Sequence, residues 1–168
     1  MIIRAFITLF FGIFLTGSIR AQEDPGLKVL GHVVVTVYHA TNGDPKVAGK
    51  KALAVDQKTA DRLRKDERLR FKNYRLLGQD TQPLLRSYES WAQPLKPSEE
   101  IMVRFEAQGR PTKKSAILDL ELWLGLKKTM KTDARLEGDR PLFVLGPEWR
   151  GGRLIIAAAL APAGKTGS

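Results

Sequence analysis

The chain has 168 residues and carries 28 Lys and Arg against 18 Asp and Glu, which gives a formal net charge of +10. It contains no cysteine, which excludes disulfide bonds, thiol catalysis, iron–sulfur clusters and cysteine zinc sites. At this length we expect one domain with a substantial hydrophobic core, and the basic charge favours acidic partners or surfaces.

The first 21 residues have the layout of a secretory signal peptide. Arg4 precedes an apolar run from Ala5 to Leu15, and small residues precede Ala21. The run is shorter than the roughly 20 apolar residues that a membrane-spanning helix needs, and Arg20 closes it, although an uncleaved anchor is the alternative. We expect cleavage after Ala21, a periplasmic or secreted protein, and no transmembrane span after cleavage. The mature chain keeps a formal charge of +8 on 147 residues (10 − 2 and 168 − 21).

Residues 22–161 are predicted to form a single β-rich domain, and residues 162–168 a flexible tail. The first strand is expected in "LKVLGHVVVTVYHA", residues 27–40, which is rich in β-branched side chains. Val33, Val35 and Val37 fall on one face of it, so we expect a long, well-buried strand. The turn "TNGDP" ends it.

Histidine offers little metal chemistry in this chain. Its two histidines, His32 and His39, are seven residues apart. This odd spacing puts them on opposite faces of a regular strand, so they cannot share a metal unless a bulge intervenes. We expect His39 to be a hydrogen-bonding residue beside the turn Asn42–Asp44, His32 to be partly buried, and the protein to bind no metal and no other cofactor.

A helix is predicted from Val55 to about Leu69. Asp56 can cap its N-terminus, and Asp61 can pair with Lys65 one turn later. Ala60 and Leu63 supply a thin apolar stripe.

The rest of the chain reads as short strands separated by Gly and Pro turns. The predicted strands lie within residues 70–78, 83–95, 99–109, 115–126, 127–136, 140–146 and 152–161. In "AILDLELWL" the alternation places Leu118, Leu120, Leu122 and Leu124 inward. These patterns predict a mainly β protein, an antiparallel β-sandwich or barrel-like domain with one short helix, and an open α+β sheet is the alternative.

The outward face of "AILDLELWL" carries Asp119 and Glu121, two carboxylates roughly 6 to 7 Å apart along an ideal strand. That separation allows a hydrolase that uses a carboxylate pair. If residues 99–109 and 115–126 form a hairpin, however, Arg104 falls near Asp119 on the exposed face. A cross-strand ion pair is then the simpler interpretation, and we do not expect an enzyme.

A basic segment runs from Arg62 to Arg75, where seven of fourteen residues are Lys or Arg, Arg70 and Lys72 among them. Acidic residues interrupt it, it crosses from a helix into a strand, and export removes the usual nucleic-acid partners. We therefore expect a solvated, cationic strand edge or a site for a polyanion at the cell envelope, and not a nucleic-acid site.

The stretch "GPEWRGGRL", residues 146–154, has glycine spacing like that of a phosphate-binding loop but lacks the required Lys and Ser or Thr. It is predicted to be a β-hairpin with Trp149 near its tip, held away from the core by the turn glycines. Trp149 and Arg150 are residue types that anchor protein interfaces. Together with Arg70 and Lys72 they form our candidate partner-binding site, and a Trp149 lid over one end of the sandwich is the alternative.

The stretches "VDQKTADRLRKDERLRFKNYRLLG" and "PLFVLGPEWRGGRLIIAAALAPA" resemble a loose family of small exported bacterial β-rich domains of unknown function. In that family a short helix leads into a Tyr-centred strand and a Gly-rich hairpin closes the chain. The resemblance implies export and a mainly β domain, and no catalytic residue. We expect an exported, non-enzymatic structural or binding module, in contact with an envelope protein or an anionic surface.

Overall fold

The computed structural model describes residues 23–109, 111–112, 114–138 and 140–162. The predicted signal peptide and almost all of the predicted tail lie outside the described residues. The described chain contains three 3-10 helices, η1 (Pro25–Leu27), η2 (Pro45–Ala48) and η3 (Glu67–Leu69), and one α-helix, α1 (Gln57–Arg64). Its strands are β1 (Val29–Thr41), β2 (Leu53–Ala54), β3 (Asn73–Leu85), β4 (Ser90–Ala92), β5 (Ile101–Gln108), β6 (Ser115–Leu124), β7 (Lys127–Glu137), β8 (Leu142–Trp149) and β9 (Gly152–Leu160).

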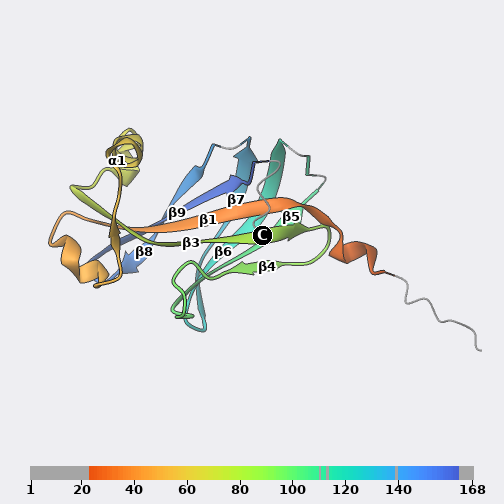
Figure 1. Cartoon of the computed structure of the whole chain (residues 1–168), viewed down its shortest axis with the longest axis horizontal. Helices are drawn as coiled ribbons and strands as arrows, with labels where there is room; N and C mark the ends of the chain where they lie inside the picture. Colours follow the sequence, from red (N-terminus) through yellow and green to blue (C-terminus); the bar gives the residue numbers. More distant parts are fainter. Residues whose placement is uncertain (1–22, 110, 113, 139, 163–168) are drawn as a thin grey trace, which may run out of the picture.

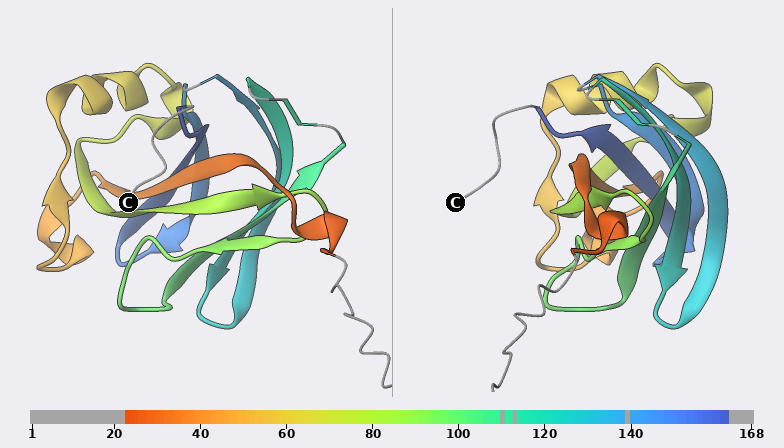
Figure 2. Two further views of the ribbon diagram at one scale, coloured as in Figure 1. Left: turned by 45° about the vertical axis from the view of Figure 1, so that its right-hand side comes forward. Right: turned by 90° about the vertical axis from the view of Figure 1, so that its right-hand side faces the viewer.

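The strands form two antiparallel sheets that pack face to face (Figure 1). The first has five strands in the order β2-β3-β1-β9-β8, and the second has four in the order β4-β5-β6-β7. Figure 2 shows the sheets as two layers, with α1 beside the five-stranded one. The predicted β-sandwich with one short helix is confirmed.

The main core lies between the sheets and follows from the period-two alternation of their strands. Val33, Val35 and Val37 of β1 are fully buried there, as predicted. Leu118 and Leu120 of β6 meet them from the other layer, because alternate residues of both strands point inward.

A second core cluster lies on the outer face of the five-stranded sheet, under α1. Ala60 and Leu63, the predicted stripe, contact Tyr74 of β3 and Ile155 of β9 within this cluster. Asp56 caps the helix as predicted, since its Oδ1 accepts the backbone N–H of Thr59 at 2.9 Å.

The helix is shorter than predicted. It ends at Arg64 because Asp66 begins a separate 3-10 turn, in which its carboxylate accepts the Arg68 N–H. The predicted pair of Asp61 with Lys65 is replaced by one with Arg64, at 3.2 Å. The predicted helix therefore does not extend into residues 66–69.

Two strand predictions also need correction. Residues 79–82, which separate two predicted strands, belong to one continuous strand, β3, because β1 pairs with it from Val29 to Thr41. The two-residue strand β2, paired with Leu76 and Arg75, was not predicted. The continuous β3 follows from the length of β1, and β2 pairs with the other edge of β3, so both depend on hydrogen-bonding partners that a local sequence pattern does not contain.

Candidate functional site

Trp149 ends β8 at the predicted hairpin with β9. Arg150 and Gly151 form the turn with φ angles of 45° and 67°, both in the left-handed region. The pairing of Trp149 with Gly152 closes the hairpin, which confirms this part of the prediction.

The indole of Trp149, however, is not held away from the core. It is 9% exposed and belongs to the cluster between the sheets. Its Nε1 donates to Glu100 Oε1 at 3.1 Å, across to the four-stranded sheet. The expectation of a projecting Trp149 is wrong because the strand alternation turns this side chain inward, and the indole closes one end of the sandwich as a lid.

Arg150 covers this lid from outside. Its guanidinium lies 4.3 Å from the Trp149 ring centroid and bonds Glu100, with Nη2 2.9 Å from Oε2. Contacts within the chain thus occupy both hairpin residues of the candidate site, and partner binding by Trp149 or Arg150 stays a prediction.

His39 lies directly beneath the lid: it is a hydrogen-bonding residue as predicted, but its partner is Trp149 of the hairpin and not the turn Asn42–Asp44. It is fully buried, its ring meets Trp149 edge-on at 5.7 Å, and its Nε2 is 3.2 Å from the Trp149 carbonyl oxygen. Burial lowers the pKa of His39 below its ordinary value, against a smaller opposing effect of the backbone hydrogen bonds. His32 is partly buried, as predicted.

The carboxylate pair lies on the outer face of the four-stranded sheet. Arg104 of β5 is directly opposite Glu121, and Glu106 is opposite Asp119. The Arg104 Nη1 is 3.8 Å from Asp119 Oδ2 and 3.7 Å from Glu121 Oε1, so the predicted cross-strand ion pair is confirmed.

This cluster is more buried than the predicted exposed face. The side chain of Glu121 is 6% exposed and that of Arg104 is 18% exposed. Trp123 covers the carboxylate and donates its Nε1 to Glu121 Oε2 at 2.9 Å. Lys128 Nζ reaches Glu121 Oε1 at 3.1 Å, and Lys131 Nζ reaches Asp119 Oδ2 at 2.8 Å.

Burial alone raises the pKa of Glu121, but the hydrogen bonds from Trp123 and Lys128 and the charges of Lys128 and Arg104 outweigh it. The pKa of this carboxyl therefore lies below its usual value. General acid catalysis by a carboxylate pair needs one carboxyl that keeps its proton, which requires a raised pKa. The lowered pKa does not suit Glu121 to the role of that acid, and its contacts with Trp123, Lys128 and Arg104 are those of a structural ion network.

Arg70 and Lys72, the other two residues of the candidate site, are exposed and flank Phe71. Arg70 donates its Nε to the Arg64 carbonyl oxygen at 3.2 Å, and the Lys72 backbone N–H donates to Asn42 Oδ1 at 2.9 Å. The backbone of Lys72 is thus held by Asn42, and the Arg70 guanidinium is held at the Arg64 carbonyl oxygen, while both residues remain exposed.

The structure does bring this segment near the hairpin. Phe71 shares an open hollow of about 450 Å³ with Asn42 and Gly43 and with Gly151 and Arg153 of the hairpin region. The two halves of the candidate site therefore flank one hollow, although only the half with Arg70 and Lys72 offers free cations.

These cations belong to a larger surface, residues 45–75, which we call the basic lobe. It comprises η2, β2, α1, η3 and the first residues of β3, and it occupies the end of the molecule that bears α1 in Figure 1. It contains eleven Lys and Arg and four Asp and Glu, so its formal charge is +7 (11 − 4) of the chain's +10. Sequence reasoning recognised only the second half of it, because the first half carries four lysines spread over residues 46–58 and forms no dense basic run.

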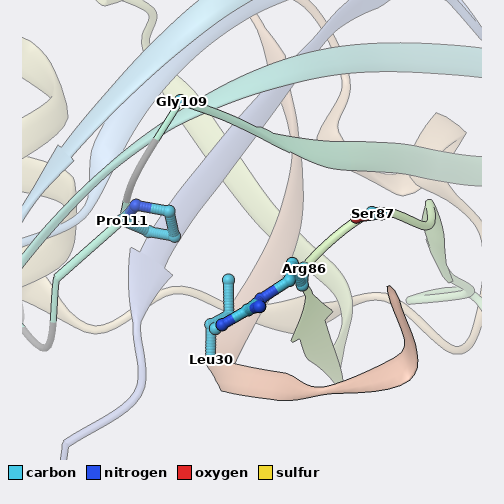
Figure 3. Close-up of a pocket in the computed structure, with 5 residues that line it drawn as sticks. All are labelled: Leu30, Arg86, Ser87, Gly109 and Pro111. Atoms are coloured by element: carbon cyan, nitrogen blue, oxygen red, sulfur yellow. The ribbon is translucent and has the colours of Figure 1, made fainter. Parts of the chain in front are cut away.

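A second hollow, of about 590 Å³, opens at the other end of the sandwich (Figure 3). Leu30 and Arg86 line it from one side, and Gly109 and Pro111 from the connection between β5 and β6. Ser87 completes the lining, so Arg86 is the sole ionisable group among these residues. The described residues that line the hollow offer neither a paired nucleophile and base nor a set of metal ligands.

No protein-family model, curated protein or solved structure matches the chain. The resemblance to a loose family of exported domains therefore stays a prediction. Among the described residues, no helix is long and apolar enough to cross a membrane.

Proposed function

We propose that this protein is an exported, non-enzymatic binding module that contacts an anionic surface of the cell envelope through the basic lobe. The pattern of residues 1–21 supports export, and the charge of the lobe supports the anionic partner. The observation that carries the proposal is that most Lys and Arg side chains of the lobe have no carboxylate nearby among the described residues.

Two of the eleven cations in the lobe, Arg64 and Arg68, lie within 4.0 Å of a carboxylate of the described chain. Nine (11 − 2) have no such neighbour among the described residues: Lys46, Lys50, Lys51, Lys58, Arg62, Lys65, Arg70, Lys72 and Arg75. The outer face of the four-stranded sheet is different, since Arg104, Lys128 and Lys131 are all ion-paired. Like charges that repel one another on one surface are stabilised when an anionic partner approaches.

The lobe is also held rigid by its own arginines. The Arg62 guanidinium lies 5.2 Å from the Phe143 ring centroid and donates to the Pro141 carbonyl oxygen at 3.4 Å. The Arg64 guanidinium lies 5.4 Å from the centroid of Tyr74. These contacts fix α1 on the sheet, and Arg62 keeps its charge uncompensated because it has no carboxylate within 4.0 Å among the described residues, whereas Arg64 pairs with Asp61.

A soluble polyanion, dextran sulfate, tests the proposal. The protein should bind it with an affinity that falls steeply between low and physiological salt, because exposed charges are screened over about 10 Å at 0.1 M. The variant Lys58→Glu/Arg70→Glu/Lys72→Glu should bind at least tenfold more weakly.

The matched control is Lys28→Glu/Lys114→Glu/Arg135→Glu, which makes the same change in net charge at exposed positions outside the lobe. It should keep most of the affinity. Equal losses in both triple variants would show that net charge alone governs binding and would overturn the assignment to the lobe.

A further inference from the structure

Three exposed aliphatic side chains lie on turns and short elements of the sandwich. Leu126, in the turn between β6 and β7, is 95% exposed. Leu53 of β2 is 63% exposed and Val47 of η2 is 43% exposed. Exposed apolar side chains of this size are candidates for contact with a partner or a membrane when they gather on one side of a protein.

A chain of contacts places these elements at the same end of the sandwich. Gly49, which follows η2, lies against the Arg150 guanidinium: a Cβ added to Gly49 would be 3.2 Å from Nη1. Arg150 bonds Glu100, and the Glu100 carbonyl oxygen accepts the Gly125 N–H at 3.0 Å. The turn that holds Leu126 is therefore joined to η2 through the Trp149 hairpin.

At least one lysine lies close in sequence to each exposed side chain. Lys46, Lys50 and Lys51 flank Val47 and Leu53, and Lys127 follows Leu126. All four lysines are exposed and none has a carboxylate within 4.0 Å in the described part of the chain. Exposed apolar side chains with lysines beside them suit an interface that is anionic at its surface and apolar just beneath it.

We propose that Val47, Leu53 and Leu126 insert into an anionic lipid leaflet, with the neighbouring lysines among the headgroups. This inference rests on the proposed function, because it names the anionic surface that the basic lobe contacts as a lipid bilayer. A protein partner fits less well, since energetic anchors at protein interfaces are clustered and rich in Trp, Tyr and Arg. A bilayer has no fixed shape, so aliphatic side chains that are separated from one another can each insert into it.

Sedimentation with vesicles tests the inference. The protein should bind vesicles of phosphatidylglycerol and phosphatidylcholine and should not bind phosphatidylcholine alone. The variant Leu53→Ser/Leu126→Ser should bind the anionic vesicles at least tenfold more weakly and keep the dextran sulfate affinity of the parent.

The matched control is Leu27→Ser/Val29→Ser, which removes two side chains of 56% and 50% exposure. Leu27 ends η1 and Val29 begins β1, so both lie at the opposite end of that strand from η2. This variant should bind anionic vesicles as the parent does.

Direct insertion can be read from a fluorophore, because the chain has no cysteine and a single one can be labelled. An environment-sensitive dye on Leu126→Cys should shift to shorter wavelengths on anionic vesicles, and the same dye on Leu27→Cys should not. Absence of the shift, or full vesicle binding by Leu53→Ser/Leu126→Ser, overturns the inference.

The two proposals fail separately. Binding to dextran sulfate without binding to anionic vesicles overturns the lipid inference and leaves the proposed function in place. Vesicle binding and a dye shift that survive the charge reversal of Lys58, Arg70 and Lys72 support insertion and overturn the role of those cations.

Discussion

Trp149 and Glu100 join the two layers of the sandwich. The indole Nε1 of Trp149, at the end of β8, donates to Glu100 Oε1 at 3.1 Å, immediately before β5 of the other sheet. Arg150 bonds the same carboxylate, so one acidic residue holds both residues of the hairpin tip. The hairpin therefore helps to close this end of the sandwich.

We expect Trp149→Ala to lower the free energy of unfolding by about 3 kcal/mol or more, because it removes a large buried side chain and leaves a cavity over His39. Chemical denaturation of the purified domain measures this loss. Trp91→Ala is the control, since Trp91 is 37% exposed and should cost clearly less. A Trp149→Ala protein as stable as the parent would contradict the lid.

Arg104 should contribute more to the free energy of unfolding than a residue of an exposed ion pair does. Arg104 is 18% exposed and has four carboxylates within 4.0 Å, of which Glu106 is the nearest at 2.9 Å. Arg104→Met should therefore lower the free energy of unfolding by about 1–3 kcal/mol, as Lys128 and Lys131 still compensate Glu121. Arg68→Met is the control, because the Arg68 side chain in its pair with Asp66 is 80% exposed and should show no measurable loss. Equal results in the two variants would argue against a buried network.

His39 should make stability fall on mild acidification. Since its folded-state pKa is lowered, the unfolded chain takes up the proton first, near pH 6.5, and the free energy of unfolding declines as the pH falls through and below that value. The nearest charges are Arg150, which opposes protonation, and Glu100 beyond the indole. His39→Gln should flatten the decline between about pH 7 and pH 5. His32→Gln should retain it, and a decline unchanged in His39→Gln would assign it to another group.

Gly152 is required where β9 passes His39. A Cβ at this position would overlap the His39 imidazole and the Ala40 carbonyl oxygen. Gly152→Ala should therefore cost about 2–3 kcal/mol, because the backbone must move to relieve the overlap. Gly31→Ala, where a Cβ meets nothing within 4 Å, should be tolerated, and thermal unfolding compares the two.

The exported form should begin at Gln22. The short apolar run and the small residues before Ala21 predict cleavage there. N-terminal sequencing of the protein recovered from the cell envelope or the medium measures the start, and a protein that still begins at Met1 would contradict the prediction.

The alternation of apolar and polar residues predicted those features of the fold that are set within a single strand or hairpin. The inward valines of β1, the inward leucines of β6 and the hairpin at Arg150 all follow from period-two patterns and turn residues. Alternation assigns a side chain to a face but says nothing of what covers that face. Glu121 was therefore predicted on the correct face, and its burial beneath Trp123 was not.

The lid could not be predicted because its partners are distant in sequence. Trp149 meets His39 and Glu100, which are 110 and 49 residues away. No local pattern encodes those contacts. The extent of the basic lobe was missed because Lys46, Lys50 and Lys51 lie in η2 and in the turn before β2, a strand that the local pattern did not predict.

The pairing of β1 with β9 governs when the chain can fold. β1 is the first strand and lies at the centre of its sheet, yet Val33 pairs with Leu160, 127 residues later (160 − 33). The centre of the five-stranded sheet is thus incomplete until the last strand has been synthesised. Contacts between residues so far apart slow the search for the native state, so we expect folding in milliseconds to seconds. A nascent chain that stays unfolded to its end remains able to thread through a narrow translocation channel.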